Sequence, residues 1–183
     1  MEIADKAAQI LLSGGVIAYP TEGVFGLGCL PSDDEAVQRL LEIKQRNPSK
    51  GLILLAASAS QFDDWISLPA SFSLPPPDPD KPITWIVPAG KKAGYQIQGD
   101  NAGIAVRITT HPVAQAICEA AGSPIVSTSA NLGGQPVAPS QFILRRQFGR
   151  LVDYVVPGPC GPSAGASEIR DFLSGDVLRP HKQ

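Results

Sequence analysis

The stretch LLEIKQRNPSKGLILLAA, residues 40–57, joins the end of an amphipathic helix pattern to a run of apolar residues typical of a buried strand. Three cations, Lys44, Arg46 and Lys50, lie between these two patterns. Because Pro48 disfavours helical angles at the residue before it, the helix is expected to end close to Lys44. In an extended backbone, Lys44 and Arg46 would then point to the same side and could bind one anion. The alternative is a solvated helix end whose cations merely suit the helix dipole, and this stretch alone favours that alternative.

Helix and strand patterns also alternate on both sides of this stretch, which predicts an α/β fold around one twisted sheet. Short loops indicate that some strand pairs are antiparallel. Gly26 and Gly28 are expected to allow close approach of a backbone or a ligand, and the proline-rich residues 69–82 to form a stiff surface connection. A capping box formed by Ser32 and Glu35 is expected to open the second helix. The predicted helices cover residues 3–11, 32–44, 61–68, 112–121 and 140–148, and the predicted strands cover 16–19, 52–57, 83–87, 103–108, 124–127, 151–156, 167–172 and 176–179.

Composition limits the classes of protein to consider. The chain has 183 residues, which most simply form a single domain over residues 1–183. A net charge of −2 argues against binding nucleic acid through bulk positive charge, so any phosphate site must be local. The three cysteines form no CxxC pair, and with two histidines there is no pattern for a zinc site. The start of the chain does not resemble a signal peptide, and no apolar run is long enough to cross a membrane. We therefore expect a cytoplasmic protein.

Several common catalytic motifs are absent from the sequence. There is no P-loop pattern and no G-x-S-x-G elbow, and Gly26-Leu27-Gly28 lacks the third glycine of a dinucleotide-binding fingerprint. His111 precedes Pro112 and is interpreted as a helix-start residue rather than a general base. Cys29 is interpreted as a packing residue rather than a nucleophile. These motifs leave the function open.

Two polar clusters suggest a site. Residues 127–131, STSAN, gather three hydroxyls and an amide at a strand end, where they could bind phosphate, ribose or substrate. A hydroxyl-rich turn stabilised by its own backbone is an equally ordinary interpretation. Arg107 lies inside the apolar strand pattern GIAVRI and needs a partner, either an acidic side chain or an anionic ligand. Both alternatives stay open at this point.

Five segments occur together in an order that resembles the YrdC family of threonylcarbamoyl-AMP synthases. The similarity extends from about Ile10 to Arg179, and its K-x-R and S-x-N elements are specific in combination with YPTE. The length resembles the short, single-domain bacterial form. The segments are VIAYPTEGVFGLGC, EIKQRNPSKGLILLAA, IAVRITTHP, VSTSANLGGQP and SEIRDFLSGDVLRP.

The resemblance implies an open, mixed parallel and antiparallel sheet with flanking helices and a concave basic face. It implies an enzyme, a nucleotidyltransferase, that joins L-threonine, bicarbonate and ATP into threonylcarbamoyl-AMP and releases pyrophosphate. A downstream complex would then transfer the threonylcarbamoyl group to the adenosine next to the tRNA anticodon. Mg²⁺ would be expected with ATP, although the sequence shows no carboxylate cage to hold it and we expect no metal-ligating residues.

The site residues implied by the resemblance fall into groups. Catalytic roles would belong to Lys44, Arg46, Ser129 and Asn131, which would also contact the nucleotide. Lys50 and Arg179 would be further nucleotide contacts. Thr21, Arg107 and Ser167 would bind the amino acid, with Arg107 suited to its carboxylate. Lys44 and Arg46 are expected to leave the helix together and to face Ser129 and Asn131 across one cleft.

A different class of function remains as an alternative. The chain could be a non-catalytic factor that binds tRNA or double-stranded RNA, or a ribosome-maturation factor, through the same basic face. The near-neutral net charge and the few aromatic residues make this alternative weaker. The sequence also departs from the family pattern, because Asn47 stands between Arg46 and the proline that commonly follows it, and PDPDKPIT replaces the usual W-P-G-P.

Overall fold

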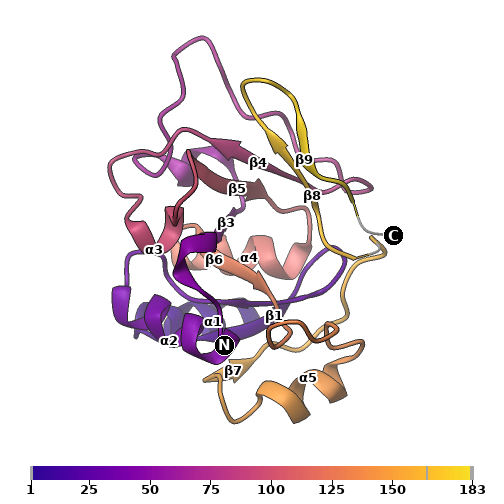
Figure 1. Cartoon of the computed structure of the whole chain (residues 1–183). Helices are drawn as coiled ribbons and strands as arrows, with labels where there is room; N and C mark the ends of the chain where they lie inside the picture. Colours follow the sequence, from indigo (N-terminus) through magenta and orange to yellow (C-terminus); the bar gives the residue numbers. More distant parts are fainter. Residues whose placement is uncertain (1, 164, 182–183) are drawn as a thin grey trace.

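The computed structural model describes residues 2–163 and 165–181 (Figure 1). The described segments form five α-helices, two short 3-10 helices and nine strands. They are α1 (Ile3–Leu12), β1 (Ile17–Pro20), β2 (Phe25–Gly28), α2 (Asp34–Lys44), η1 (Pro48–Lys50), β3 (Ile53–Ala56), η2 (Ala59–Phe62), β4 (Ile83–Val87), α3 (Tyr95–Gln98), β5 (Ile104–Ile108), α4 (Pro112–Ala121), β6 (Ile125–Ser129), α5 (Gln141–Phe148), β7 (Tyr154–Val155), β8 (Glu168–Asp171) and β9 (Val177–Arg179).

The strands form one mixed sheet in the order β7-β1-β2-β6-β3-β5-β4-β8-β9. Three neighbouring pairs are parallel, namely β1 with β7, β3 with β5 and β4 with β8, and the other pairs are antiparallel. The prediction of an open α/β fold around a mixed sheet is therefore confirmed. The two strands predicted over residues 167–172 and 176–179 are also confirmed, as β8 and β9, which form an antiparallel pair around a turn at Gly175.

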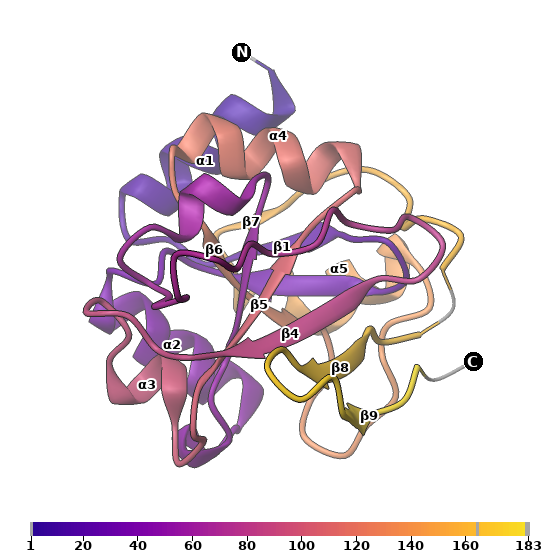
Figure 2. The same ribbon diagram turned by 90° about the horizontal axis from the view of Figure 1, so that it is seen from above.

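Side chains alternate between two apolar cores along the central strands. In β3, Leu54 and Ala56 pack into one core, whereas Leu55 packs into the other. This is the period of two that a strand buried on both faces requires. Helices α2 and α5 cover the first core, while α1 and α4 lie side by side over the second (Figure 2).

Helices α1 and α4 cover only part of their face of the sheet. Leu55 and Ile125 lie in the core with these helices, but Ile53 and Ser127, two residues away along the same strands, line a cavity. Residues two apart on a strand point to the same face. The cavity is therefore the uncovered continuation of the face on which α1 and α4 pack.

The start of α2 differs from the prediction. Asp33, not Ser32, is the N-cap residue, and its side chain accepts a hydrogen bond from the backbone N–H of Ala36 at 2.9 Å. A carboxylate in this position satisfies an otherwise free N–H and also suits the positive end of the helix dipole. The capping box predicted from Ser32 and Glu35 is therefore wrong by one residue.

Two further local predictions were wrong. No α-helix covers residues 61–68, where the short η2 is followed by an isolated bridge between Ile66 and Ala89. Tertiary contacts explain the difference, because the Gln61 side chain accepts from the N–H of Ala57 and donates to the carbonyl of Cys118. Residues 88–101, for which no helix or strand was predicted, contain the single helical turn α3.

Gly28 confirms the expectation of a close approach. A Cβ at Gly28 would lie 2.4 Å from the carbonyl oxygen of Val126 and 2.9 Å from the ring of Tyr19, which is fully buried. Since neither neighbour can withdraw, Gly28→Ala is expected to lower the free energy of unfolding by about 2 kcal/mol, measured by urea denaturation. The control is Gly133→Ala, where the nearest atom would be 3.7 Å away. Equal losses for the two variants would contradict this explanation.

Candidate active site

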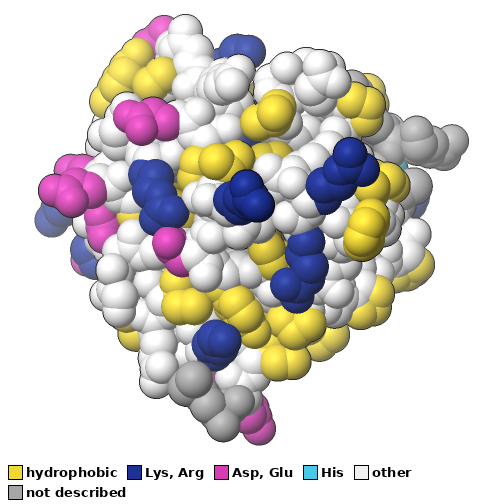
Figure 3. Space-filling view, turned by 90° about the horizontal axis from the view of Figure 1, so that it is seen from below, with side chains coloured by type: hydrophobic (Ala, Val, Ile, Leu, Met, Phe, Trp, Pro, Cys, Tyr) yellow, Lys and Arg dark blue, Asp and Glu magenta, His cyan; other side chains and the backbone are white. Residues whose placement is uncertain are grey.

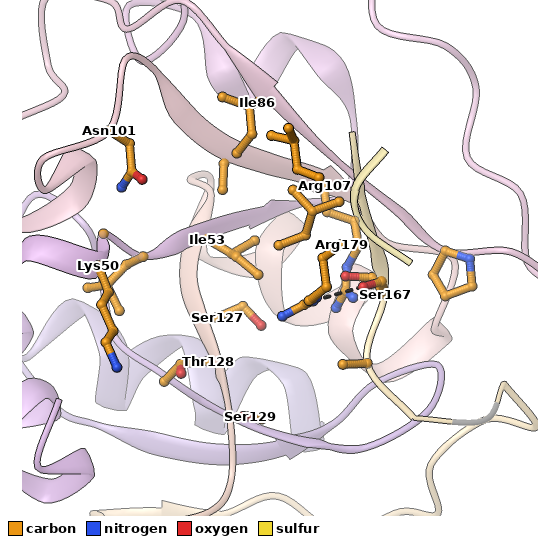
Figure 4. Close-up of a pocket in the computed structure, with 18 of the residues that line it drawn as sticks. Lys50, Ile53, Ile86, Asn101, Arg107, Ser127, Thr128, Ser129, Ser167 and Arg179 are labelled. Carbon is orange, nitrogen blue, oxygen red and sulfur yellow. Dashed lines mark hydrogen bonds between the residues drawn. The ribbon is translucent and has the colours of Figure 1, made fainter. Parts of the chain in front are cut away.

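A cavity of about 440 Å³ opens on the uncovered part of the sheet (Figure 4). Strands β3, β5 and β6 contribute its floor, and its rim comes from the turn between β1 and β2, the segment after α2 and the C-terminal hairpin. This volume is in the usual range for sites that bind small molecules. Seven of the nine predicted site residues line it, namely Thr21, Arg46, Lys50, Arg107, Ser129, Ser167 and Arg179.

The polar groups are divided between two ends of the cavity. Figure 4 shows Lys50 near Asn101 at one end and Arg107, Arg179 and Ser167 together at the other. The hydroxyls of β6 and the apolar side chain of Ile53 lie between them. Such a cavity could hold an elongated ligand, or two ligands side by side, with a negative group at each end.

Lys44 and Arg46 separate at the end of α2. Gln45 has the left-handed conformation, with φ of 49°, and terminates the helix directly after Lys44. Arg46 turns into the cavity, where its Nη2 donates to the carbonyl of Gly51 at 2.8 Å. The prediction that Lys44 and Arg46 leave the helix together is therefore wrong, because the chain reverses between them.

Lys44 is buried and does not line the cavity. Its Nζ donates to the carbonyl of Ser129 at 2.5 Å, to Oδ1 of Asn131 at 2.8 Å and to the carbonyl of Asn131. Burial, together with the nearby charge of Arg46, lowers the pKa of Lys44 to about 8. Lys44 thus does face Ser129 and Asn131 as predicted, but it binds them directly and fixes the turn that follows β6.

The turn after β6 is also held by its own side chains. Ser129 Oγ donates to Asn131 Oδ1 at 2.7 Å, and Asn131 Nδ2 donates to the carbonyl of Gln135 at 2.8 Å. Of the two side chains, Ser129 lines the cavity and Asn131 does not. The interpretation of STSAN as a self-stabilised turn is therefore correct for Asn131, while Ser129 is presented to the cavity.

Arg107 has an acidic partner that sequence reasoning missed. Nη2 of Arg107 lies 3.5 Å from Oε2 of Glu22, and both side chains are buried. Oε1 of Glu22 accepts from Thr109 Oγ1 at 2.7 Å and from the N–H of Thr110 at 2.9 Å. A signal was available in the sequence, because Glu22 is the only charged residue between Lys6 and Asp33. A solitary charge in an apolar, glycine-rich segment needs a partner elsewhere.

The C-terminal hairpin supplies Arg179 to the same end of the cavity. Nη2 of Arg179 donates to the carbonyl of Ser167 at 2.8 Å, drawn as a dashed line in Figure 4. Ser167 Oγ forms a hydrogen bond with Thr84 Oγ1 at 2.7 Å, and Thr21 Oγ1 donates to the carbonyl of Val24 at 2.6 Å. These contacts hold the side chains in fixed positions around the opening.

The cavity lining carries an excess of positive charge. Its cations are Arg46, Lys50, Arg107 and Arg179, and its acidic residue is Asp171. Burial lowers the pKa of Arg46, with Arg179 adding to the effect, and burial and Arg107 do the same for Arg179. These partly buried arginines disfavour one another's charge, so an anionic ligand would be stabilised between them. In Figure 3, Lys and Arg side chains on one face are separated by apolar ones.

Two side chains excluded by sequence reasoning are also outside this cavity. His111 is the N-cap residue of α4, and its Nε2 lies 3.1 Å from the carbonyl oxygen of Pro159. Cys29 is buried in an apolar core, and burial raises the pKa of its thiol. Their interpretation as a helix-start residue and a packing residue is confirmed.

Among the residues that the structure describes, no group of three or more His, Cys, Asp and Glu side chains could hold a metal ion. Within the described ranges, every helix is too short or too polar to cross a bilayer.

Comparison with known families gives one match over most of the chain. A model of the Sua5/YciO/YrdC family, described as "Telomere recombination", matches residues 9–181. The curated threonylcarbamoyl-AMP synthase of Stenotrophomonas maltophilia is 46% identical, with 96% of each chain covered. The protein of the same name from Alkalilimnicola ehrlichii is 47% identical over 95% of this chain and 93% of its own.

Solved structures share the fold. P. abyssi Sua5 in complex with L-threonine has a TM-score of 0.85 and 28% identity. That similarity covers 98% of this chain and 55% of the Sua5 chain. E. coli YciO has a TM-score of 0.79 and 24% identity, covering 97% of this chain and 88% of its own, and supports the fold alone.

Proposed function

This chain belongs to the Sua5/YciO/YrdC family, and on that premise we propose that it is a threonylcarbamoyl-AMP synthase. The observation that carries the proposal is the cavity, which has cations at both ends and lies in a chain matching curated synthases over nearly its full length. One end suits a triphosphate and the other suits an amino-acid carboxylate. The enzyme would thus act as a nucleotidyltransferase, with ATP, L-threonine and bicarbonate as substrates.

The reaction requires no covalent intermediate on the protein. The amine of threonine combines with bicarbonate to form a carbamate and water, and a carbamate oxygen then attacks the α-phosphorus of ATP. The bond between the α-phosphorus and pyrophosphate breaks, so the products are threonylcarbamoyl-AMP and pyrophosphate. The protein must hold the reactants together and stabilise negative charge on the transferring phosphoryl group and on pyrophosphate.

We assign the phosphate contacts to Arg46 and Lys50, with Ser129 between the phosphates and the reacting centre. Arg46 has a fixed orientation because its guanidinium is bound to the Gly51 carbonyl, and its planar fork suits phosphate oxygens. Lys44 and Asn131 would contribute to catalysis by holding the turn that presents Ser129.

We assign the amino-acid contacts to Thr21, Arg107 and Ser167, with Arg107 binding the carboxylate. Support comes from Arg107 itself, which lines the cavity and whose guanidinium is only partly paired, by a 3.5 Å contact with Glu22. Arg179 lies beside these groups and would contact the nucleotide from the same side (Figure 4). A buried guanidinium that keeps unpaired donors is stabilised when an anion accepts from it.

Mg²⁺ is expected to enter with ATP. Among the residues that the structure describes, the cavity lining offers the carboxylate of Asp171 but no cage of oxygen ligands for a separate magnesium site. In nucleotide sites this ion is commonly held by substrate phosphates and water with few protein ligands. The steps assigned above to the side chains do not depend on the metal.

The proposed product is reactive and requires a second protein. We propose that a tRNA threonylcarbamoyl-transfer complex accepts it in the cytoplasm, and that residues 1–183 act as one YrdC-like domain.

The alternative of a non-catalytic factor that binds tRNA or double-stranded RNA is disfavoured, because the matched relatives are named as synthases. The described cation cluster lies inside a cavity of small-molecule size, and it therefore supports a small ligand better than a duplex.

The test is pyrophosphate release by the purified protein. Release is expected only when L-threonine, bicarbonate and ATP are all present, and mass spectrometry should detect threonylcarbamoyl-AMP. Serine and glycine serve as control amino acids. Equal release without threonine, or with either control, would contradict the proposal. The RNA-binding alternative instead predicts no turnover and an RNA affinity that falls steeply with salt.

A further inference from the structure

Glu22 lies behind the amino-acid end of the cavity rather than in its lining. It is 4% exposed and does not line the cavity, but its ion-pair partner Arg107 does. Hydrogen bonds from Thr109 and Thr110 fix one carboxylate oxygen, and the other oxygen faces Nη2 of Arg107. Glu22 therefore acts on a ligand through its charge and through Arg107 rather than by direct contact.

Glu22 is ionised at neutral pH despite its burial. Burial alone would raise the pKa of Glu22, but the charge of Arg107 and the hydrogen bond from Thr109, with further backbone hydrogen bonds, lower it below its usual value. This end of the cavity therefore contains two cations, Arg107 and Arg179, and one buried anion. The three side chains together carry a charge of about +1.

The buried charges at this end are only partly paired with one another. Nε of Arg107 and Nε of Arg179 are buried without a hydrogen-bond partner among the described residues, although both residues line the cavity. Oε2 of Glu22 is likewise without a hydrogen bond, because its 3.5 Å contact with Arg107 is an ion pair at long range. Glu22 thus cancels part of the charge of Arg107 without a close hydrogen bond to it.

We propose that Glu22 sets the charge selectivity of this end of the cavity, so that it accepts the single carboxylate of an amino acid and rejects phosphate. The proposal rests on the function proposed above for its assignment of Arg107 to the amino acid. A local charge of +1 is matched by one carboxylate, whereas inorganic phosphate, a mixture of mono- and dianion at neutral pH, brings between about one and two negative charges. Without Glu22 the local charge would be +2, which suits phosphate.

Such selectivity would keep phosphate-containing ligands out of the amino-acid end of this cavity. Both ends carry arginine, so ATP, pyrophosphate and phosphate all have two cationic places to bind. Electrostatic specificity against the wrong ligand is commonly obtained by an added repulsive group rather than by better contacts with the right one. A buried carboxylate behind Arg107 repels a dianion more strongly than an amino-acid zwitterion, whose net charge is zero.

The experiment measures competition between phosphate and L-threonine by isothermal titration calorimetry, so that phosphate bound elsewhere does not interfere. In the Glu22→Gln variant the amide oxygen can still accept from Thr109 and Thr110, but the charge is gone. We expect phosphate to compete on the order of tenfold more strongly in this variant than in the unmodified protein, while threonine affinity changes by less than about threefold. Glu22→Asp, which keeps the charge, is expected to retain the original preference.

Glu168→Gln is the matched control. Glu168 forms an ion pair with Arg170 on β8, and neither residue lines the cavity, although their neighbours Ile169 and Asp171 do. It is expected to leave the competition unchanged. The proposal is overturned if Glu22→Gln competes like the unmodified protein, or if it loses threonine and phosphate binding alike. If Glu22→Gln does not fold, loss of the preference in the charged Glu22→Asp variant would also overturn it.

The assay separates the two proposals. An unmodified protein that makes threonylcarbamoyl-AMP, with no change of preference in Glu22→Gln, refutes only the selectivity role. A changed preference in a protein that releases no pyrophosphate refutes only the proposed function. Absence of threonine binding in the unmodified protein overturns both.

Discussion

Replacement of Arg46 by methionine is expected to reduce the rate of pyrophosphate release by at least about 100-fold, with little change in threonine affinity. Arg46 lines the cavity at the end assigned to ATP, and its pKa is lowered mainly by burial, with a smaller effect from the charge of Arg179. A guanidinium in such a site stabilises charge on the departing pyrophosphate more than charge on bound ATP. The loss should therefore be larger in kcat than in KM for ATP.

Arg170→Met is the matched control for Arg46→Met. Arg170 lies on β8, pairs with Glu168 and does not line the cavity. Its replacement should leave the rate within about twofold, as for surface changes away from a site. If the two variants lose activity equally, or if Arg46→Met changes only threonine binding, the assignment of Arg46 to the phosphates is wrong.

Lys44→Met is expected to lose activity by a similar factor for a different reason. The buried ammonium holds Ser129 and Asn131 through three hydrogen bonds, and methionine leaves these acceptors unpaired. We expect the free energy of unfolding to fall by about 2–3 kcal/mol. Hydrogen exchange of the backbone amides in residues 129–135 should become faster in Lys44→Met and remain unchanged in Arg46→Met.

The titration of Lys44 gives a second measurement on the same variant. Its pKa is about 8 in the folded protein, whereas the ordinary value for an exposed lysine is 10.5. Between these values the unfolded chain binds more protons than the folded one, so this group makes the free energy of unfolding rise with pH. The rise should be absent from Lys44→Met. Normal exchange in residues 129–135 and an unchanged pH dependence would contradict a role for Lys44 in holding the turn.

Much of the fold could be predicted because its signals are local. Two helices end just before glycines with positive φ, Gly14 and Gly122. In the sequence each of these glycines follows an apolar segment with helical periodicity, which indicates a helix end. Strands β3 to β6 were visible as apolar runs between turns. Some predictions failed because of a distant group, as at Gln61, whose side chain binds Cys118 where a helix was predicted, and others because of a neighbouring residue, as at the N-cap Asp33.

The candidate site likewise has a part that the sequence could predict and a part that it could not. The residue types were visible in the sequence, since cations beside a strand, a hydroxyl-rich turn and an arginine in an apolar strand could each belong to an anion site, and the family resemblance assigned them to one site. Their separate roles could not be predicted, because Lys44 and Arg46 look equivalent in the sequence. In the structure the left-handed Gln45 ends the helix between them, and Lys44 is buried whereas Arg46 lines the cavity.

Composition, periodicity and motif order were thus sufficient for the class of fold, the family resemblance and the set of polar residues, since each depends on neighbours along the chain. The pairing of Glu22 with Arg107 depends instead on which strands and turns meet in space. The cavity also depends on tertiary structure, because it opens where α1 and α4 leave their face of the sheet uncovered. A long charged side chain can reach many partners, and only the packed sheet selects one of them by bringing that partner within hydrogen-bond or ion-pair distance.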